Sequence, residues 1–269
     1  MINNNLILII FILLVSIFYF LDDYLYKREQ YIAENFISFN RQNIEIIIAR
    51  YNEDLAWTLE KPFNQYKYIV YNKGDNENFE KANVKEIIKL ENVGKCDHTY
   101  LYHIIKKYDN LSEITVFFPG SLDMPYKKRI ASRLLKDIEQ KNKAIFISLN
   151  ENDIKKLHYN FKLDSYKTTH YSNKSKNPEV LLKKSDIRPF GRWFENMFGD
   201  IKVNCLIYYG IFSIHKGDIV QHQKSRYEFL IKDLSDHSNP EVGHYFERSW
   251  CAVFHPLNNT YIIKYNKIK

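Results

Sequence analysis

IEIIIARYNED, residues 44–54, is the stretch that decides the predicted fold. Residues 44–49 are of strand length and rich in isoleucine, and the polar cluster 50–54 follows at once. Such a run predicts a buried strand that ends in a turn. Because a strand buried on both faces needs cover on both sides, the predicted fold class is α/β.

Further along the chain, strand and helix patterns alternate. Three more runs of strand length are each followed by turn or polar residues. They are residues 66–71 (YKYIVY), 114–118 (ITVFF) and 144–148 (AIFIS). We therefore expect a single mixed or mostly parallel sheet with helices on both faces.

Apolar residues at helical spacing mark the helices between and after these strands. The stripes are 101/104/105/108, 130/134/138, 227/230/231/234 and 246/250/253/254. Asp97 or Thr99 is expected to cap the first of these helices, because their side-chain oxygens can accept free backbone N–H groups. Glu247 lies at the edge of the last stripe, where a side chain can enter a cleft. The bland alternative for Glu247 and Arg248 is a charged surface pair.

The N-terminus carries a separate apolar segment, LILIIFILLVSIFYFL, residues 6–21. It predicts a single-pass membrane anchor over residues 1–21, a juxtamembrane stalk over 22–42 and one globular domain over 43–269. A cleavable signal peptide and a buried core helix are the alternatives. No basic residue precedes the run and no small-x-small pattern follows it, which disfavours the signal peptide.

The side of the membrane stays open on sequence grounds. Lys27 and Arg28 follow the span, which favours a cytoplasmic body. Three N-x-[ST] sequons, starting at Asn110, Asn173 and Asn258, point the other way.

Charge and cysteine content bound the partners. The formal net charge of +7 suits an anionic partner, such as a nucleotide phosphate or an acidic membrane surface, without requiring one. Nucleic acid is not expected, because the basic residues are dispersed and no recognition motif occurs; the basic row Arg129, Arg133 and Lys136 is expected to be a solvated helix face. The three cysteines have no C-x-x-C spacing, so three unpaired thiols are expected. One disulfide is the alternative if the domain faces an oxidising lumen.

Several common catalytic motifs are absent: the sequence has no GxxxxGK[ST], GxGxxG, HExxH or GxSxG. Polar clusters remain at or beside the predicted carboxyl ends of strands, at 50–54, 72–75, 92–95 and 120–123. Each cluster alone is typical of a turn, yet this edge is where open α/β sheets bind ligands. A pocket holding Arg50, Lys73 and Asp123 would suit a metal-bridged diphosphate. Residues 151–184 lack periodicity and predict a long mobile loop, either a lid or an acceptor loop.

Five segments resemble a family catalogued as a domain of unknown function, which occurs in fungi and large DNA viruses among others. They are 46–57 (IIIARYNEDLAW), 69–74 (IVYNKG), 90–111 (LENVGKCDHTYLYHIIKKYDNL), 115–121 (TVFFPGS) and 241–254 (EVGHYFERSWCAVF), and the resemblance covers roughly residues 44–256.

That family is similar to nucleotide-sugar glycosyltransferases of the GT-A type. The resemblance implies that Asp123 holds a divalent metal, Mn or Mg, that Glu247 is the base or an acceptor-orienting group, and that residues 209–213 flank the acceptor. The residues it assigns to the nucleotide are Arg50, Asn52, Glu53 and Asp54, and the strand-end cluster at 72–75 adds Lys73 to the same site.

Two departures from the family pattern stand out. Only Leu122-Asp123-Met124 occurs where such enzymes carry D-x-D, and Lys95-Cys96 stands where many members carry Arg-Glu. The implied function is membrane-anchored transfer of a sugar from a nucleotide-sugar to a glycan, protein or lipid acceptor. The alternative is a non-catalytic, membrane-tethered glycan- or lipid-binding module of the same fold.

Overall fold

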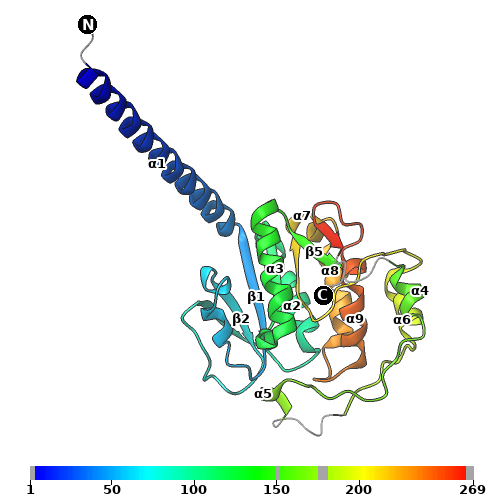
Figure 1. Cartoon of the computed structure of the whole chain (residues 1–269). Coiled ribbons are helices and arrows are strands. Elements are labelled where there is room, and N and C mark those ends of the chain that lie inside the picture. Colours follow the sequence, from blue (N-terminus) through cyan, green and yellow to red (C-terminus); the bar gives the residue numbers. More distant parts are fainter. Residues whose placement is uncertain (1–3, 149–151, 175–180, 265–269) are drawn as a thin grey trace. The chain divides into compact units, whose positions relative to one another are not determined.

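The computed structural model describes the backbone of residues 4–148, 152–174 and 181–264; it leaves out the side chains of residues 4–13, 33, 35–40 and 174. The chain divides into two compact units, Met1–Gln42 and Asn43–Lys269 (Figure 1). The second unit contains all the strands and is called the body below.

The first unit is one helix, α1 (Asn4–Gln42), which runs through both the predicted anchor and the predicted stalk. Among the residues that the structure describes, no helix combines the length and apolar content needed to cross a membrane. Residues 1–3 of the predicted anchor, and the side chains of residues 4–13, lie outside the description. The transmembrane part of the predicted fold therefore has no support from the structure.

The body is built on a mixed, mostly parallel sheet with strand order β3-β2-β1-β4-β6. Four strands are parallel and β6 pairs antiparallel with β4. The strands are β1 (Ile44–Arg50), β2 (Tyr68–Asn72), β3 (Val84–Lys89), β4 (Ile114–Pro119) and β6 (Phe212–His215). The predicted α/β class is confirmed.

One predicted strand lies elsewhere. β5 (Ile145–Ser148) pairs with β7 (Tyr261–Lys264) in a separate two-stranded sheet. Its place beside β4 is taken by β6, whose Ser213 hydroxyl accepts the Ile145 backbone N–H at 2.6 Å. The expectation that residues 144–148 join the main sheet is wrong for this reason.

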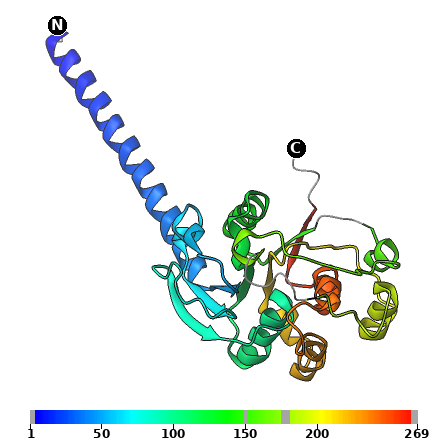
Figure 2. The same ribbon diagram turned by 90° about the horizontal axis from the view of Figure 1, so that it is seen from below.

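The two faces of the sheet bury alternate residues of the same strands. Ile47 and Phe117 belong to a cluster that includes α2 (Lys95–Lys107) and α9 (Glu241–Val253). Ile48 and Phe118 belong to a second cluster, with α3 (Pro125–Lys141). Figure 2 shows α2 and α3 on opposite sides of the sheet. Helices therefore cover both faces, which explains why the central strands β1, β2 and β4 are buried on both sides.

The remaining helices are short: α4 (Ile154–His158), α5 (Tyr171–Lys174), α6 (Phe190–Phe198), α7 (Lys216–Val220) and α8 (Lys224–Leu230). The predicted stripe 130/134/138 is buried in α3, and its basic row, Arg129, Arg133 and Lys136, is exposed. The predicted loop 151–184 contains α4 and α5, and its residues 151 and 175–180 lie outside the described residues.

Helix α2 begins before the predicted capping residues. Gly94 and Lys95 both have positive φ, 58° and 54°, and no side chain caps the helix. A Cβ on Gly94 would lie 2.4 Å from the Leu234 carbonyl oxygen, so this turn requires glycine. Asp97 therefore falls inside the first turn, and the prediction that Asp97 or Thr99 caps the helix is wrong.

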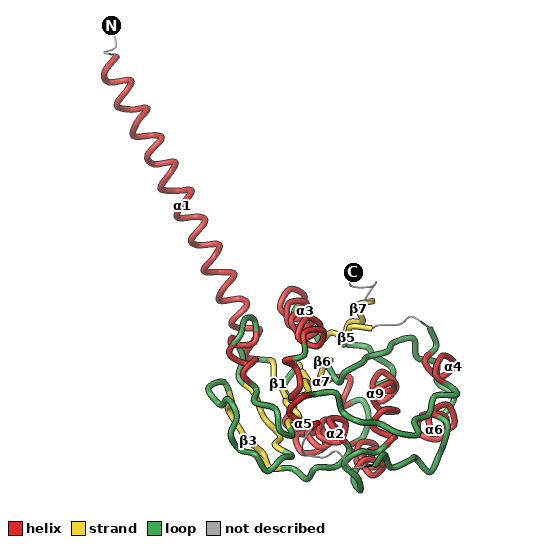
Figure 3. The backbone as a smooth tube through the Cα atoms, turned by 60° about the horizontal axis from the view of Figure 1, so that its bottom comes forward, coloured by secondary structure: helices red, strands yellow, loops and turns green. Residues whose placement is uncertain are grey.

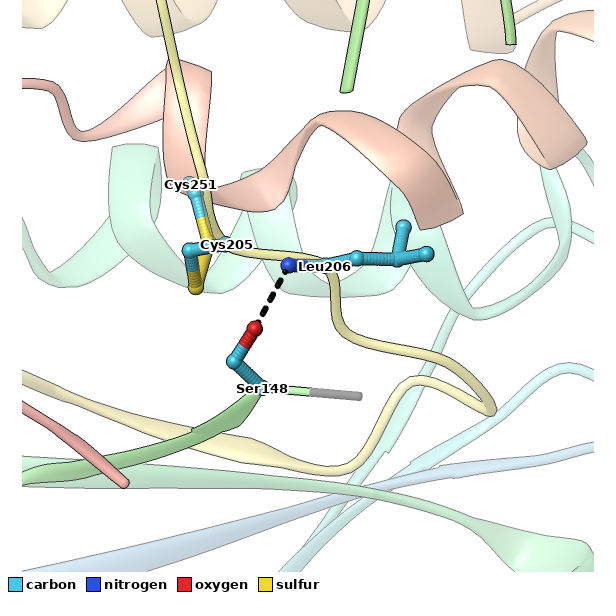
Figure 4. The surroundings of a disulfide bond; sticks show 4 residues. All are labelled: Ser148, Cys205, Leu206 and Cys251. Carbon is cyan, nitrogen blue, oxygen red and sulfur yellow. Dashed lines mark hydrogen bonds between the residues drawn. A yellow bond between two sulfur atoms is a disulfide. The ribbon is translucent and has the colours of Figure 1, made fainter. Parts of the chain in front are cut away.

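Two of the three cysteines are joined. Cys205, in the segment before β6, forms a disulfide with Cys251 of α9, beside a hydrogen bond from the Leu206 N–H to the Ser148 hydroxyl (Figure 4). The expectation of three unpaired thiols is therefore wrong for this pair. Cys96 is free and partly buried.

Candidate functional site

A pocket of about 760 Å³ opens where β1 and β4 end. From β1 the chain builds β2 and β3 on one side, then crosses to place β4 on the other, so the carboxyl ends of β1 and β4 form a topological switch point. Open α/β sheets bind ligands in the crevice at such a point. Figures 1 and 3 both place α5 at this end of β1.

All four predicted polar clusters contribute to this pocket. The lining residues they supply are Arg50, Tyr51, Glu53, Lys73, Asn92, Lys95, Gly120 and Ser121. The prediction of a shared pocket at the strand ends is therefore confirmed in position.

Arg50 holds the ends of β1 and β2 together. Its buried guanidinium donates to the Glu53 carbonyl and to the Asn72 side-chain oxygen, both at 2.6 Å, and lies 4.0 Å from the Phe79 ring centre. One terminal nitrogen, Nη2, is buried without a hydrogen-bond partner in the described part of the chain. Most of the guanidinium N–H groups of Arg50 therefore donate to the strand ends and loops around the pocket.

The neighbouring acidic residues divide between the pocket and the turn. The Glu53 carboxylate lines the pocket and accepts the Tyr51 N–H at 2.7 Å and the Asn173 side-chain amide at 2.8 Å. Asp54 accepts the Ala56 N–H at 2.9 Å, as a turn residue does. The structure places neither Asp54 nor Asn52 among the lining residues.

Four lysines line the pocket, and three of them, from different elements, are buried or partly buried. The Lys73 ammonium donates to the carbonyls of Val93 and Lys95. The Lys95 ammonium lies 3.7 Å from the Tyr166 ring centre. Burial lowers the pKa of Lys73 and of Lys95 to about 8. Lys127 of α3 donates to the Ser121 hydroxyl at 2.6 Å, and burial lowers its pKa too.

Asp123 lies outside the lining residues. Its carboxylate oxygen lies 2.8 Å from His170 Nε2, within hydrogen-bond distance. The described residues contain no group of three or more His, Cys, Asp or Glu side chains that would hold a metal. Asp123 offers one carboxylate, so a divalent cation there would take its other ligands from a diphosphate and water, as Mg²⁺ commonly does, and the metal stays a prediction.

A pair of carboxyl groups faces the lysines. The Glu247 carboxylate accepts the Tyr209 backbone N–H at 2.8 Å, and Asp97 accepts the Trp250 indole N–H at 2.9 Å. Burial, followed by the negative charge of Glu247, raises the pKa of Asp97 to about 7. Glu247 was predicted as the base, whereas Asp97 was predicted only as a helix cap.

Residues 166–173, here called the covering segment, complete the pocket. Tyr166, Thr168, His170 and Asn173 line it, and the last two are tied to Asp123 and Glu53 as described above. These residues lie within the predicted loop 151–184, whose role as a lid or acceptor loop stays a prediction. No local sequence pattern could have found these contacts, because they depend on how the chain returns to the strand ends.

A family model described as "Protein of unknown function (DUF3431)" matches residues 46–266. The chain belongs to this family. The matched DUF3431 region contains every residue that lines the pocket.

No curated protein matches the chain in sequence. Among solved structures, the crystal structure of 4-diphosphocytidyl-2C-methyl-D-erythritol synthase from Anaerococcus prevotii is similar at 12% identity. The likeness covers 86% of this chain and 92% of that chain with a TM-score of 0.36, at which it bears on neither fold nor function.

Several candidate residues of this DUF3431 member were missed from sequence. They are Cys96, Asp97, Tyr126, Lys127, Tyr166 and His170. Cys96 and Asp97 lie in a segment that carries the family resemblance, so their place in that motif was the one available signal.

Proposed function

We propose that the pocket binds a nucleotide-sugar and that the body transfers the sugar to an acceptor hydroxyl. The observation that carries the proposal is the excess of positive charge among the residues that line the pocket at the switch point. The described lining residues include five cations, Arg50, Lys73, Lys95, Lys127 and Lys167, and three carboxyl groups, Glu53, Asp97 and Glu247. Five against three leaves two positive charges, which favours an anion such as a diphosphate.

The size and the aromatic walls support an organic ligand rather than a bare phosphate. About 760 Å³ falls within the range of small-molecule sites. Tyr126 and Tyr209 meet edge to face with ring centres 5.0 Å apart, and both line the pocket. Their rings offer flat apolar surfaces, with a polar tip, to a base or a sugar ring.

In the proposed reaction the acceptor oxygen attacks the anomeric carbon of the sugar. The bond from that carbon to the phosphate oxygen breaks, and the nucleoside diphosphate leaves with the electron pair. The acceptor proton passes to the Glu247 carboxylate, which the Tyr209 N–H holds in place. Lys95 and Lys127 offset the charge that develops on the leaving diphosphate.

The proposal includes two predictions that came from the sequence. One is a divalent metal near Asp123, and the other is attachment to a membrane through residues 1–21. Neither contributes to the step above, and each has its own test.

Thermal unfolding of the full-length chain with UDP-, GDP- and CMP-sugars, with and without Mn²⁺, tests the proposal. A ligand that binds the folded state raises the midpoint. A shift with one nucleotide class, followed by sugar transfer that Glu247→Gln abolishes, supports the transferase. Binding without turnover favours the glycan- or lipid-binding alternative. The absence of any shift contradicts nucleotide-sugar binding. Equal shifts with and without Mn²⁺, also in Asp123→Asn, contradict the metal prediction.

A further inference from the structure

Two segments that the resemblance singled out meet at the wall of the pocket. Asp97 lies in the first turn of α2, and Glu247 and Trp250 lie one helical turn apart on α9. The Trp250 indole fixes one oxygen of Asp97 at 2.9 Å, while both Asp97 and Glu247 line the pocket. One face of α9 therefore carries both the Glu247 carboxylate and the Trp250 indole that binds the Asp97 carboxyl group.

The two carboxyl groups differ in their access to water. Asp97 is 2% exposed, whereas the Glu247 side chain keeps 25% of its surface exposed. Glu247 also accepts the Tyr209 backbone N–H and lies 3.7 Å from Arg248 Nη1. Burial, followed by the negative charge of Glu247, raises the pKa of Asp97, so Asp97 is the group that holds a proton.

The charged and titratable groups around Asp97 come from every element packed against it. They are Lys73 after β2, Lys95, Cys96 and Tyr100 on α2, Lys127 on α3, and His244 and Glu247 on α9. Burial and the charge of Lys95 lower the pKa of His244 to about 2, so His244 stays neutral near pH 7. The lysines keep most of their charge up to about pH 7.5.

We propose that Asp97 is a positioning residue that carries a proton in the wall of the pocket, near the predicted base Glu247, and so limits the negative charge of the pocket. The inference rests on the proposed function. Loss of the Asp97 proton adds one negative charge next to an anionic donor. At a separation of several ångströms such a charge costs roughly tenfold in affinity.

The test compares the full-length chain with Asp97→Asn, which keeps an oxygen for the Trp250 indole but has no proton to lose. Asp109→Asn is the control, because Asp109 is exposed just beyond the end of the same helix. The probes are UDP-glucose and GDP-mannose, whose diphosphates do not titrate between pH 6 and 7.5. Calorimetry of the wild type and the control should give affinity about threefold weaker at pH 7.5 than at pH 6, from the roughly tenfold cost and the fraction ionised. Asp97→Asn should give a clearly smaller change, which reflects only the partial loss of charge on Lys73 and Lys95 near pH 7.5.

Infrared difference spectra provide a readout that needs no ligand. The wild type minus Asp97→Asn should show a protonated carboxyl band at pH 6 that disappears by pH 8. If that band is present and neither probe binds, the proposed function fails while the carboxyl pair stands. If a probe binds and the pH dependence is the same in wild type and Asp97→Asn, or if the band is absent at pH 6, the inference about Asp97 is overturned.

Discussion

Asp97→Asn should change how the stability of the protein depends on pH. The pKa of Asp97 is about 7 in the folded protein, whereas an aspartate in the unfolded chain has its ordinary pKa of 3.8. Between these values the folded state binds more protons than the unfolded state, so this group makes stability fall as pH rises. The stabilisation is fully present below pH 3.8 and is lost by the time the pH has passed through 7.

The magnitude follows from the two pKa values. At 1.36 kcal/mol per pKa unit, the whole shift corresponds to roughly 4 kcal/mol of unfolding free energy. Of this, about 2.5 kcal/mol is lost between pH 5 and pH 8, where the folded-state carboxyl titrates. Asparagine does not titrate, so the variant should lack this component while groups that titrate alike in both proteins cancel in the difference.

Urea denaturation followed by tryptophan fluorescence at pH 5, 6, 7 and 8 measures the effect. The free energy of unfolding of Asp97→Asn minus that of the wild type should increase by about 2.5 kcal/mol from pH 5 to pH 8, because only the wild type loses this component of its stability. Asp109→Asn should run parallel to the wild type. Parallel curves for Asp97→Asn as well would refute the assignment of a buried, protonated carboxyl group at this position.

Three further outcomes are expected. Lys127→Gln should weaken binding of a nucleotide-sugar about tenfold. The control Lys128→Gln removes a largely exposed contact to a surface glutamate and should leave the affinity unchanged. Equal affinities of the two variants would remove Lys127 from the site. Reduction of the Cys205–Cys251 disulfide should lower the unfolding free energy by about 4 kcal/mol in urea titrations with and without dithiothreitol, for a loop closed over 46 residues. The full-length chain should sediment with membranes and a chain lacking residues 1–21 should not; the same distribution for both would end the anchor prediction.

The central strands could be predicted from sequence because burial on both faces leaves a continuous apolar run, as in 44–49 and 114–118. Strand β3 could not, because VKEIIK at the edge of the sheet keeps Lys85, Glu86 and Ile87 exposed and shows no such run. The sheet membership of β5 depended on β6, a distant part of the chain that fills the position next to β4. Pairing between distant segments has no local signature.

The candidate site divides in the same way. Arg50, Glu53 and Lys73 follow strands directly, so strand prediction alone located them at the carboxyl ends. Asp97 was misplaced because Gly94 turns the chain with a positive φ and begins the helix early. The covering segment reaches the pocket through His170 and Asn173, whose partners are 47 and 120 residues away in sequence.

The disulfide has a consequence for the predicted base. Cys205 and Tyr209 are four residues apart on one segment, and Cys251 and Glu247 are four apart on α9, in the opposite direction. The S–S bond and the hydrogen bond from Tyr209 to Glu247 therefore close a small ring, with one covalent rung and one polar rung. Without the S–S bond, the position of Tyr209 opposite Glu247 would depend on noncovalent contacts alone.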